Sequence, residues 1–353
     1  MKKKSLFTTF LIVSALLTLA SCQNESWNFP DYEYQSVYFA YQYPVRTIIL
    51  GEHKFNNELD NNHQFKVMAT TAGVYENENR VMVDFEIDES LLDGFQFDGN
   101  GDPIQPLPEN YYHFTGESDQ LVIPSGELAG GITIQLTDAF FQDPDAINNT
   151  YVLPMRMTGV ANADTILSGV PKGAVSNPRR GVASDWDALP KDFTFYAVKY
   201  INRLDGFYLR RGEDVVTGQG GNSTLDTTAT RHADYIVKDE VVELNTHSLT
   251  EIEFPVTVTD GQGQDRNLTL LLEFDDSGTI TVSENASATN YTATGGGTFV
   301  HKSESEESWG DESRNAVYLD YEIDHNEIHV ETADTLVLRD RGVGMETFTP
   351  VLP

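Results

Sequence analysis

The stretch VMVDFEID, residues 81–88, decides the fold class of this chain. Its apolar residues include positions 81, 83, 85 and 87, and acidic residues stand at positions 84, 86 and 88. Successive side chains of a β-strand point to opposite faces, so this alternation predicts a strand with one buried face and one solvated face. An amphipathic helix would instead repeat its apolar residues every three or four positions.

Shorter segments on either side of this stretch follow the same pattern. One run spans residues 34–50, and Pro44 within it indicates an edge strand or a bend. Further strands are predicted at residues 65–69, 121–124, 131–136 and 151–157. Short strands at this spacing, without a long helical period, predict a β-sandwich over residues 34–161.

The series of strands is interrupted at residues 162–192, which are rich in glycine and proline. A loop of this length is uncommon inside a compact domain, so we predict a linker there. Residues 193–353 return to the strand pattern, and DDSG at residues 275–278 predicts a hairpin turn. Consecutive hairpins favour an antiparallel β-barrel or sandwich for this second unit. The whole chain is therefore expected to be all-β.

The amino terminus reads as an export signal. Residues 2–4 are lysines, residues 6–19 form an apolar run too short to span a bilayer, and LASC follows at residues 19–22. This ending resembles the bacterial lipobox, which implies a signal peptide at residues 1–21 and acylation of Cys22. Several acyl chains give stable anchoring. The alternative is a plain secretory leader followed by a stray cysteine.

The segment after Cys22, residues 22–33, is expected to be a polar tether. It contains Glu25, and acidic residues at such positions resemble the surface-export signals of glycan-harvesting Gram-negative bacteria. We therefore expect a lipid-anchored protein of the outer membrane that faces the cell exterior.

The charge and the cysteine count exclude two further features. The formal net charge is −32, which repels phosphate backbones and anionic headgroups. We expect no nucleic-acid partner, and contact with the membrane through the lipid anchor only. Cys22 is the only cysteine, so no internal disulfide can form and the core is held by packing alone.

Several stretches resemble a known family of lipoproteins. Residues 27–32, 37–48, 88–92, 107–112 and 151–154 are similar to the N-terminal domain of surface lipoproteins encoded beside starch-utilisation-system-like transporters, the domain of unknown function 1735. Residues 197–212 resemble the opening of its common C-terminal partner domain. The resemblance implies an immunoglobulin-like first domain, a β-barrel or β-sandwich second domain, and accessory binding of glycans beside a transporter. It provides no catalytic motif.

Aromatic side chains in polar segments are the candidate ligand contacts. A flat ring can stack on the apolar face of a sugar, while neighbouring polar groups pair with the hydroxyls. Trp309 lies in an acidic loop at residues 304–312, and Trp186 lies in the predicted linker between two aspartates. Tyr291 is a further candidate in a polar stretch. Each tryptophan could alternatively fill a seam between domains or close the end of a barrel.

One loop resembles a calcium site without completing it. Asp98, Asn100 and Asp102 place oxygen ligands at alternate positions. However, Pro103 replaces the glycine that the sharp turn of such a loop needs, and no helix flanks it. A solvated loop is the favoured interpretation. We predict no metal and no cofactor.

Three functions are compatible with these features. The first is capture of a polysaccharide or oligosaccharide for a neighbouring outer-membrane transporter. The second is glycoside hydrolysis by an Asp/Glu pair, but among 55 acidic residues the sequence selects no pair. The third is a structural protein that contacts other surface proteins. Acyl-transfer chemistry lacks support, because no Gly-x-Ser-x-Gly elbow is present. We predict glycan binding.

Overall fold

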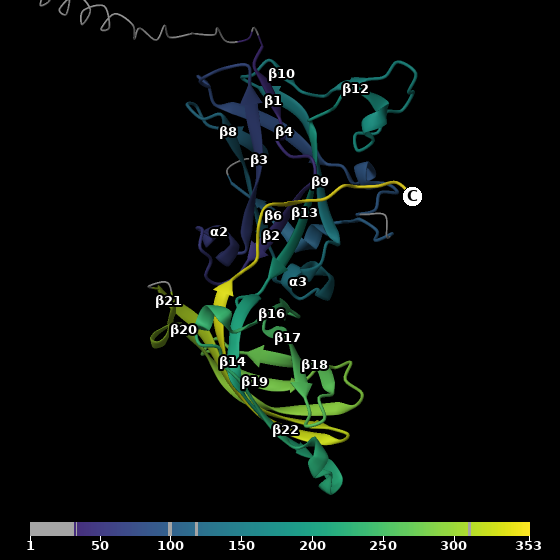
Figure 1. Ribbon diagram of the computed structural model, residues 1–353. Helices are drawn as coiled ribbons and strands as arrows, with labels where there is room; N and C mark the ends of the chain where they lie inside the picture. Colours follow the sequence, from purple (N-terminus) through teal and green to yellow (C-terminus); the bar gives the residue numbers. More distant parts are fainter. Residues whose placement is uncertain (1–31, 33, 98–100, 117–118, 310–311) are drawn as a thin grey trace, which may run out of the picture.

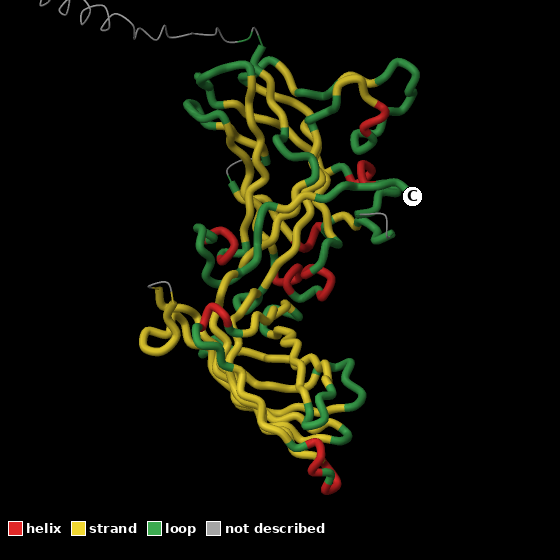
Figure 2. The backbone as a smooth tube through the Cα atoms, viewed as in Figure 1, coloured by secondary structure: helices red, strands yellow, loops and turns green. Residues whose placement is uncertain are grey.

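The chain folds into two β-rich units stacked end to end (Figures 1 and 2). The computed structural model describes residues 32, 34–97, 101–116, 119–309 and 312–353, with the side chains of residues 303–309 excepted. Cys22, Asp98 and Asn100 therefore lie outside the described residues. No helix in the described part of the chain is long and apolar enough to cross a bilayer.

The first unit is built around one large curled sheet with the strand order β10-β1-β3-β8-β7-β4-β9-β13-β2-β23. Its strands are β1 (Ser36–Tyr38), β2 (Pro44–Ile49), β3 (Gln64–Ala72), β4 (Val81–Ile87), β5 (Gln105–Pro106), β6 (Tyr112–Thr115), β7 (Gln120–Ile123), β8 (Ala129–Leu136), β9 (Tyr151–Ala161), β10 (Thr165–Ile166), β13 (Phe193–Ile201) and β23 (Glu346–Thr347). The predicted strand at residues 81–88 is confirmed as β4, which buries Val81 and Val83 in the core.

Only short helices interrupt the strands in the described chain. They are α2 (Glu58–Asn61), α3 (Asp138–Phe141), and the 3₁₀ turns η1 (Glu89–Leu92), η2 (Glu109–Tyr111), η3 (Pro144–Ile147), η4 (Ala183–Asp185), η5 (Gln219–Gly221), η6 (Ser223–Leu225) and η7 (Ile236–Lys238). The chain is therefore all-β, as the sequence predicts.

The second unit is a closed antiparallel barrel. Its strands are β14 (Gly206–Gly218), β16 (Glu240–Thr246), β17 (Glu251–Thr259), β18 (Asp265–Phe274), β19 (Thr279–Glu284), β20 (Tyr291–Trp309), β21 (Glu312–His325) and β22 (Ile328–Asp340). They pair in chain order, and β22 returns to pair with β14, which closes the barrel. A short extra strand, β15 (Thr227–Arg231), continues the wall beside β14. Closure leaves no free edge along these paired strands.

A buried charge network lies where the barrel closes. Asp334 of β22 accepts hydrogen bonds from Arg210 Nε at 3.0 Å, Arg231 Nη2 at 2.6 Å and the hydroxyl of Tyr321 at 2.8 Å. Arg231 also pairs with Asp214 of β14. Buried charges are tolerated when they are paired and hydrogen-bonded in this way. The network therefore ties β14, β15, β21 and β22 together from the inside.

The boundary between the units lies later than the residue 193 that the sequence predicts. β13 pairs antiparallel with β9 and parallel with β2, so it belongs to the first sheet through Ile201. After β22 the chain also returns to the first unit, where β23 pairs with β2 (Figure 1). The chain thus crosses between the units twice, once into the barrel and once out of it.

Candidate functional site

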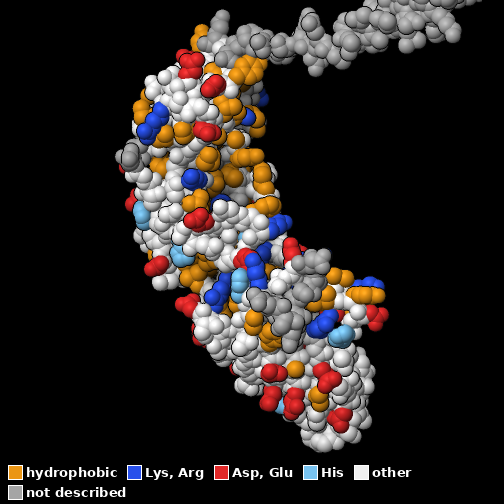
Figure 3. Space-filling view, turned by 90° about the vertical axis from the view of Figure 1, so that its left-hand side faces the viewer, with side chains coloured by type: hydrophobic (Ala, Val, Ile, Leu, Met, Phe, Trp, Pro, Cys, Tyr) orange, Lys and Arg blue, Asp and Glu red, His pale blue; other side chains and the backbone are white. Residues whose placement is uncertain are grey.

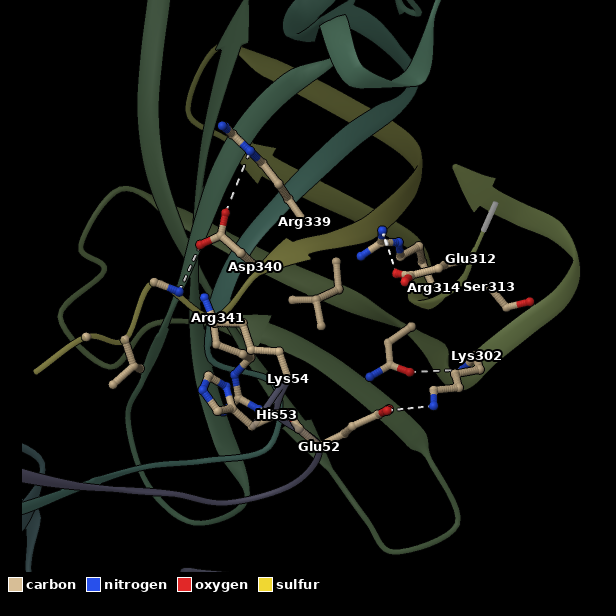
Figure 4. A pocket seen from close by; sticks show the side chains of 15 residues that line it. Glu52, His53, Lys54, Lys302, Glu312, Ser313, Arg314, Arg339, Asp340 and Arg341 are labelled. Atoms are coloured by element: carbon tan, nitrogen blue, oxygen red, sulfur yellow. Dashed lines mark hydrogen bonds and ion pairs between the residues drawn. The ribbon is translucent and has the colours of Figure 1, made fainter. Parts of the chain in front are cut away.

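A cleft of about 1010 Å³ lies where the two chain crossings meet the first unit. Its lining comes from the loop after β2, from β20 and β21 of the barrel, and from the end of β22 with the segment that follows it (Figure 4). Figure 3 shows basic side chains gathered at the narrowing between the units, on a surface that otherwise carries many acidic ones. Ligand sites commonly occur at such junctions between domains.

Arg341 forms the back of the cleft and joins the two units. Its Nη1 donates to the carbonyl oxygens of Leu50 and Glu52, both at 3.1 Å, and its Nη2 donates to the carbonyl oxygens of Leu50 at 3.2 Å and Asn202 at 2.6 Å. The side chain is only 7% exposed, and this burial lowers the pKa of its guanidinium. These bonds fix the loop after β2 against both crossings.

Glu52 makes a second bridge across the cleft. Its carboxylate lies 2.7 Å from Lys302 Nζ and 2.9 Å from His301 Nε2, both on β20 of the barrel. Burial acts to raise the pKa of Glu52, but the hydrogen bonds and charges of Lys302 and His301 outweigh it and lower the pKa. Glu52 is therefore ionised at neutral pH, which suits a hydrogen-bond acceptor and not a general acid, whose pKa must be raised.

The other carboxylates that line the cleft also lie beside cations. Glu312 is 2.9 Å from Arg314 Nη2, and Asp340 is 3.7 Å from Arg339 Nε. Each ion pair holds its two side chains in place. The carboxylates keep lone pairs, and the cations keep N–H groups, with which a ligand can form hydrogen bonds. The arrangement therefore suits recognition of a hydroxyl-rich molecule.

A second hollow of about 580 Å³ continues the cleft along the first unit. His53 and Lys54 line both hollows, and Phe55 lies in the second. The other residues of this lining are Asn56, Asn57, Glu58, Asn61 and Asn62. Phe55 is 68% exposed, with Lys54 Nζ 5.2 Å from its ring centre and the His53 ring packed edge-on at 5.7 Å. An aromatic face surrounded by amide and charged groups is the combination that sugar binding uses.

The backbone of this loop is fixed by asparagine side chains. Asn57 Nδ2 donates to the carbonyl oxygens of Ile49 at 2.8 Å and Gly51 at 2.7 Å. Asn61 Oδ1 accepts from the Gly51 N–H at 2.8 Å, and Gly51 has a positive φ of 82° that a side chain would strain. The exposure of Phe55 is therefore built into the loop.

His53 is held neutral at the centre of the site. Its burial lowers its pKa, and the positive charges of Arg341 and Lys54 lower it further.

Two of the three aromatic residues predicted from the sequence, Trp186 and Tyr291, lie away from the cleft. Trp186, in the hairpin of β11 (Val170–Pro171) and β12 (Trp186–Ala188), is 8% exposed and its Nε1 donates to the Arg179 carbonyl at 2.9 Å. It is a packing residue. Tyr291 packs against the barrel core, and its hydroxyl donates to the Thr269 carbonyl at 2.6 Å. Trp309 pairs in register with Glu312, which lines the cleft, but its side chain lies outside the described residues.

The solvated loop that the sequence favours at Asp98, Asn100 and Asp102, with calcium as its weaker alternative, stays a prediction. Asp98 and Asn100 lie outside the described residues, and the carbonyl oxygen of Asp102 accepts from the Phe97 N–H at 3.0 Å. Within the described ranges, no three His, Cys, Asp or Glu side chains converge as a metal site.

Sequence reasoning missed Phe55 and Arg341. Residues 51–63, GEHKFNNELDNNH, hold one aromatic residue in a long polar run, and that isolation is the signal that could have identified Phe55. Arg341 follows a predicted strand, and nothing local distinguishes it from a surface arginine.

Two family models match the chain, and no curated protein matches it significantly. The domain of unknown function DUF5627 matches residues 203–342, which coincide with the barrel. A model described as an N-terminal domain matches residues 32–164 of the first unit.

Solved structures extend this comparison. A Bacteroides ovatus protein of unknown function is 41% identical, covers 92% of this chain and 100% of its own, and has a TM-score of 0.84. A multidomain protein including DUF1735 from Bacteroides ovatus is 14% identical, covers 89% and 100%, and has a TM-score of 0.43. An auxiliary nutrient binding protein from Bacteroides thetaiotaomicron is 14% identical, covers 83% and 90%, and has a TM-score of 0.38. The last two are too distant to support an argument. The first, at 41% identity over nearly the whole chain, shows that this protein belongs to the same family as that Bacteroides ovatus protein, with a DUF5627 domain as its barrel.

Proposed function

We propose that this protein is a lipid-anchored glycan-binding protein of the outer membrane, which faces the cell exterior and captures a polysaccharide for a neighbouring transporter. The glycan would lie in the cleft between the two units and continue over the hollow at Phe55. The anchor would be the acylated Cys22.

The observation that carries this proposal is the fixed exposure of Phe55 beside the cleft. The ring is 68% exposed, and it lies on a loop whose backbone Asn57 and Asn61 hold at Ile49 and Gly51. The ring offers an apolar face for a sugar ring, and the adjoining cleft offers paired carboxylates, lysine and arginine for its hydroxyls.

The state of Glu52 makes this residue unsuitable as the acid of a glycosidase. A glycosidase needs one carboxyl group with a raised pKa to protonate the leaving oxygen. The pKa of Glu52 is lowered by Lys302 and His301, so this residue cannot supply that proton at neutral pH.

Isothermal titration of the mature chain against a panel of polysaccharides and their oligosaccharides tests the proposal. We expect one class of glycan to bind, and Phe55→Ala to weaken that binding about tenfold, the loss of one stacked ring. The variant Trp309→Ala tests whether Trp309, the aromatic contact predicted from the sequence, also contributes to glycan affinity.

Tyr235 provides a matched control for Phe55. It is 66% exposed, with Lys238 Nζ 5.5 Å from its ring centre, and it lines neither hollow. Tyr235→Ala should leave affinity unchanged. Equal losses in both variants, or no binding to any glycan of the panel, would contradict the proposal.

A further inference from the structure

Exposed tyrosines gather at the end of the first unit where the chain enters it. Five described tyrosines are exposed, and three of them, Tyr32, Tyr34 and Tyr75, lie at this end with 84%, 65% and 66% of their surface accessible. Scattered exposed apolar residues are normal, but a group of large ones at one end of a molecule indicates a contact surface.

Backbone contacts show that these residues are neighbours. The Tyr32 N–H donates to the Gly73 carbonyl at 2.8 Å, and a Cβ added to Gly73 would collide with the Tyr34 carbonyl oxygen. Tyr75 follows two residues later. Leu128, which is also exposed, accepts at its carbonyl from the Thr71 N–H at 2.9 Å.

A buried asparagine holds this end together. Asn77 is fully buried, its Nδ2 donates to the Pro124 carbonyl at 3.0 Å, and its Oδ1 accepts from Gln35 Nε2 at 3.1 Å. Its own carbonyl accepts from the Gly126 N–H at 2.7 Å. The three loops that carry the exposed residues are thus bonded to one another, so the surface is a fixed one.

The position of the predicted anchor indicates that this surface lies near the bilayer. Nine residues lie between Cys22 and Tyr32, and the ten Cα–Cα steps that join the two span at most about 35 Å in an extended chain. With Cys22 acylated, as proposed above, the tyrosine end would stay within that distance of the bilayer, because the chain enters the first unit there (Figure 1). The barrel lies at the opposite end of the molecule.

We propose that Tyr32, Tyr34 and Tyr75 contact the headgroup layer of the membrane and act as a second attachment beside the acyl chains. This departs from the expectation from the sequence that the lipid anchor is the only contact with the membrane. Tyrosine suits this layer, since its ring is apolar and its hydroxyl remains hydrated. The contact orients the molecule, with the barrel and the cleft pointing away from the bilayer. Glu76 and Glu78 stand beside Tyr75, so the surface suits zwitterionic and not anionic headgroups.

The test uses residues 23–353, the mature chain without its first residue, tethered through an amino-terminal histidine tag to phosphatidylcholine vesicles that contain a nickel-chelating lipid. This chain lacks Cys22, the only cysteine, so one introduced cysteine can carry a polarity-sensitive fluorophore. Tyr75→Cys reports on the proposed surface, and Tyr235→Cys, with the same exposure on the barrel, is the control.

We expect the emission of the label at position 75 to shift to the blue on tethering, and the label at position 235 to stay unchanged. Adding Tyr32→Ser and Tyr34→Ser should reduce the shift by at least half, and vesicles rich in phosphatidylglycerol should also reduce it. No shift at position 75, equal shifts at both positions, or a shift that needs added outer-membrane protein would overturn the proposal. The tag replaces the acyl chains, so this result is independent of whether Cys22 is acylated in the cell and of whether the cleft binds glycan.

Discussion

Arg341 donates from its guanidinium to the carbonyl oxygen of Asn202 at 2.6 Å, and this bond joins the segment that leaves the barrel to the segment that enters it. The same guanidinium bonds the carbonyl oxygens of Leu50 and Glu52 in the first unit. One side chain therefore holds both chain crossings against the loop that lines the cleft. The shape of the cleft depends on it.

Replacing Arg341 should destabilise the junction between the units. Arg341→Ala leaves the carbonyl oxygens of Leu50, Glu52 and Asn202 without this donor, and we expect a loss of about 3 kcal/mol in the free energy of unfolding, measured in urea. Scanning calorimetry should show separate transitions for the two units in this variant. Arg339→Ala is the control, because Arg339 is half-exposed and should change stability by less than about 0.5 kcal/mol. Similar losses in both variants would show that the bonds of Arg341 do not stabilise the junction.

The charge network of the barrel predicts a larger effect. Asp334→Ala leaves the buried guanidinium of Arg210 without the carboxylate that neutralises it, and we expect a loss of about 3–5 kcal/mol. The double variant Arg210→Met with Asp334→Leu removes both charges and should be more stable than Asp334→Ala alone. Equilibrium unfolding of the wild type, Asp334→Ala and the double variant checks this order. A double variant that is less stable than Asp334→Ala would contradict it.

Asparagine side chains in the loop after β2 should affect glycan affinity through Phe55. Asn57→Ala removes the bonds to the carbonyls of Ile49 and Gly51, so the loop that carries the ring is held less firmly. We expect a fall in affinity of about threefold to tenfold, although the ring of Phe55 is still present. Asn267→Ala is the control, because Asn267 lies on the barrel, lines neither hollow, and accepts a hydrogen bond from the Thr257 hydroxyl at 2.8 Å. Titration with the same glycan distinguishes the two, and unchanged affinity in Asn57→Ala would argue against a fixed ring.

Acid should weaken the first unit through Asp143. Its carboxylate accepts hydrogen bonds from the hydroxyls of Tyr111 at 2.7 Å and Tyr151 at 2.5 Å. Burial acts to raise its pKa, but these bonds and the bond from the Asp145 N–H outweigh it, so the pKa is lowered in the folded state. The stability that Asp143 contributes is therefore present above its unfolded pKa of about 4 and is lost as the pH falls through the folded value.

Asp143→Asn should remove this part of the pH dependence. Urea unfolding at a series of pH values between about 3 and 7 should show a flatter stability profile in the variant, with the difference from the wild type shrinking at the acidic end. A constant difference across the series would show that Asp143 is not the titrating group.

The fold class could be predicted because the deciding signals are local. Alternation such as that of residues 81–88 reflects one strand and its two faces, and the structure confirms it as β4. The boundary between the two units could not be predicted, because β13 is placed in the first sheet by pairing with strands that are distant in the sequence. Phe193 and Phe195 pack in one core cluster and Val198 and Tyr200 in another, so this strand is buried on both faces inside the first sheet. Nothing within its own sequence names β9 and β2 as its neighbours.

The candidate site was harder to predict for the same reason. Tryptophan is the side chain best suited to stack on a sugar, but Trp186 is used in packing. Phe55 is exposed because Asn57 and Asn61 fix a loop with a left-handed glycine, and that is a property of the folded loop. Arg341 acts across 139 residues of chain to reach Asn202, a distance at which sequence patterns carry no information.

The central claim is that a glycan binds in the cleft between the two units. Hydrogen–deuterium exchange of the mature chain, with and without the glycan that binds best in titration, tests it most directly. We predict protection on binding in residues 51–62 and 338–344, which line the cleft and its continuation, and no change at residues 232–239 on the side of the barrel. Protection confined to other segments, or exchange that no glycan alters, would contradict the claim.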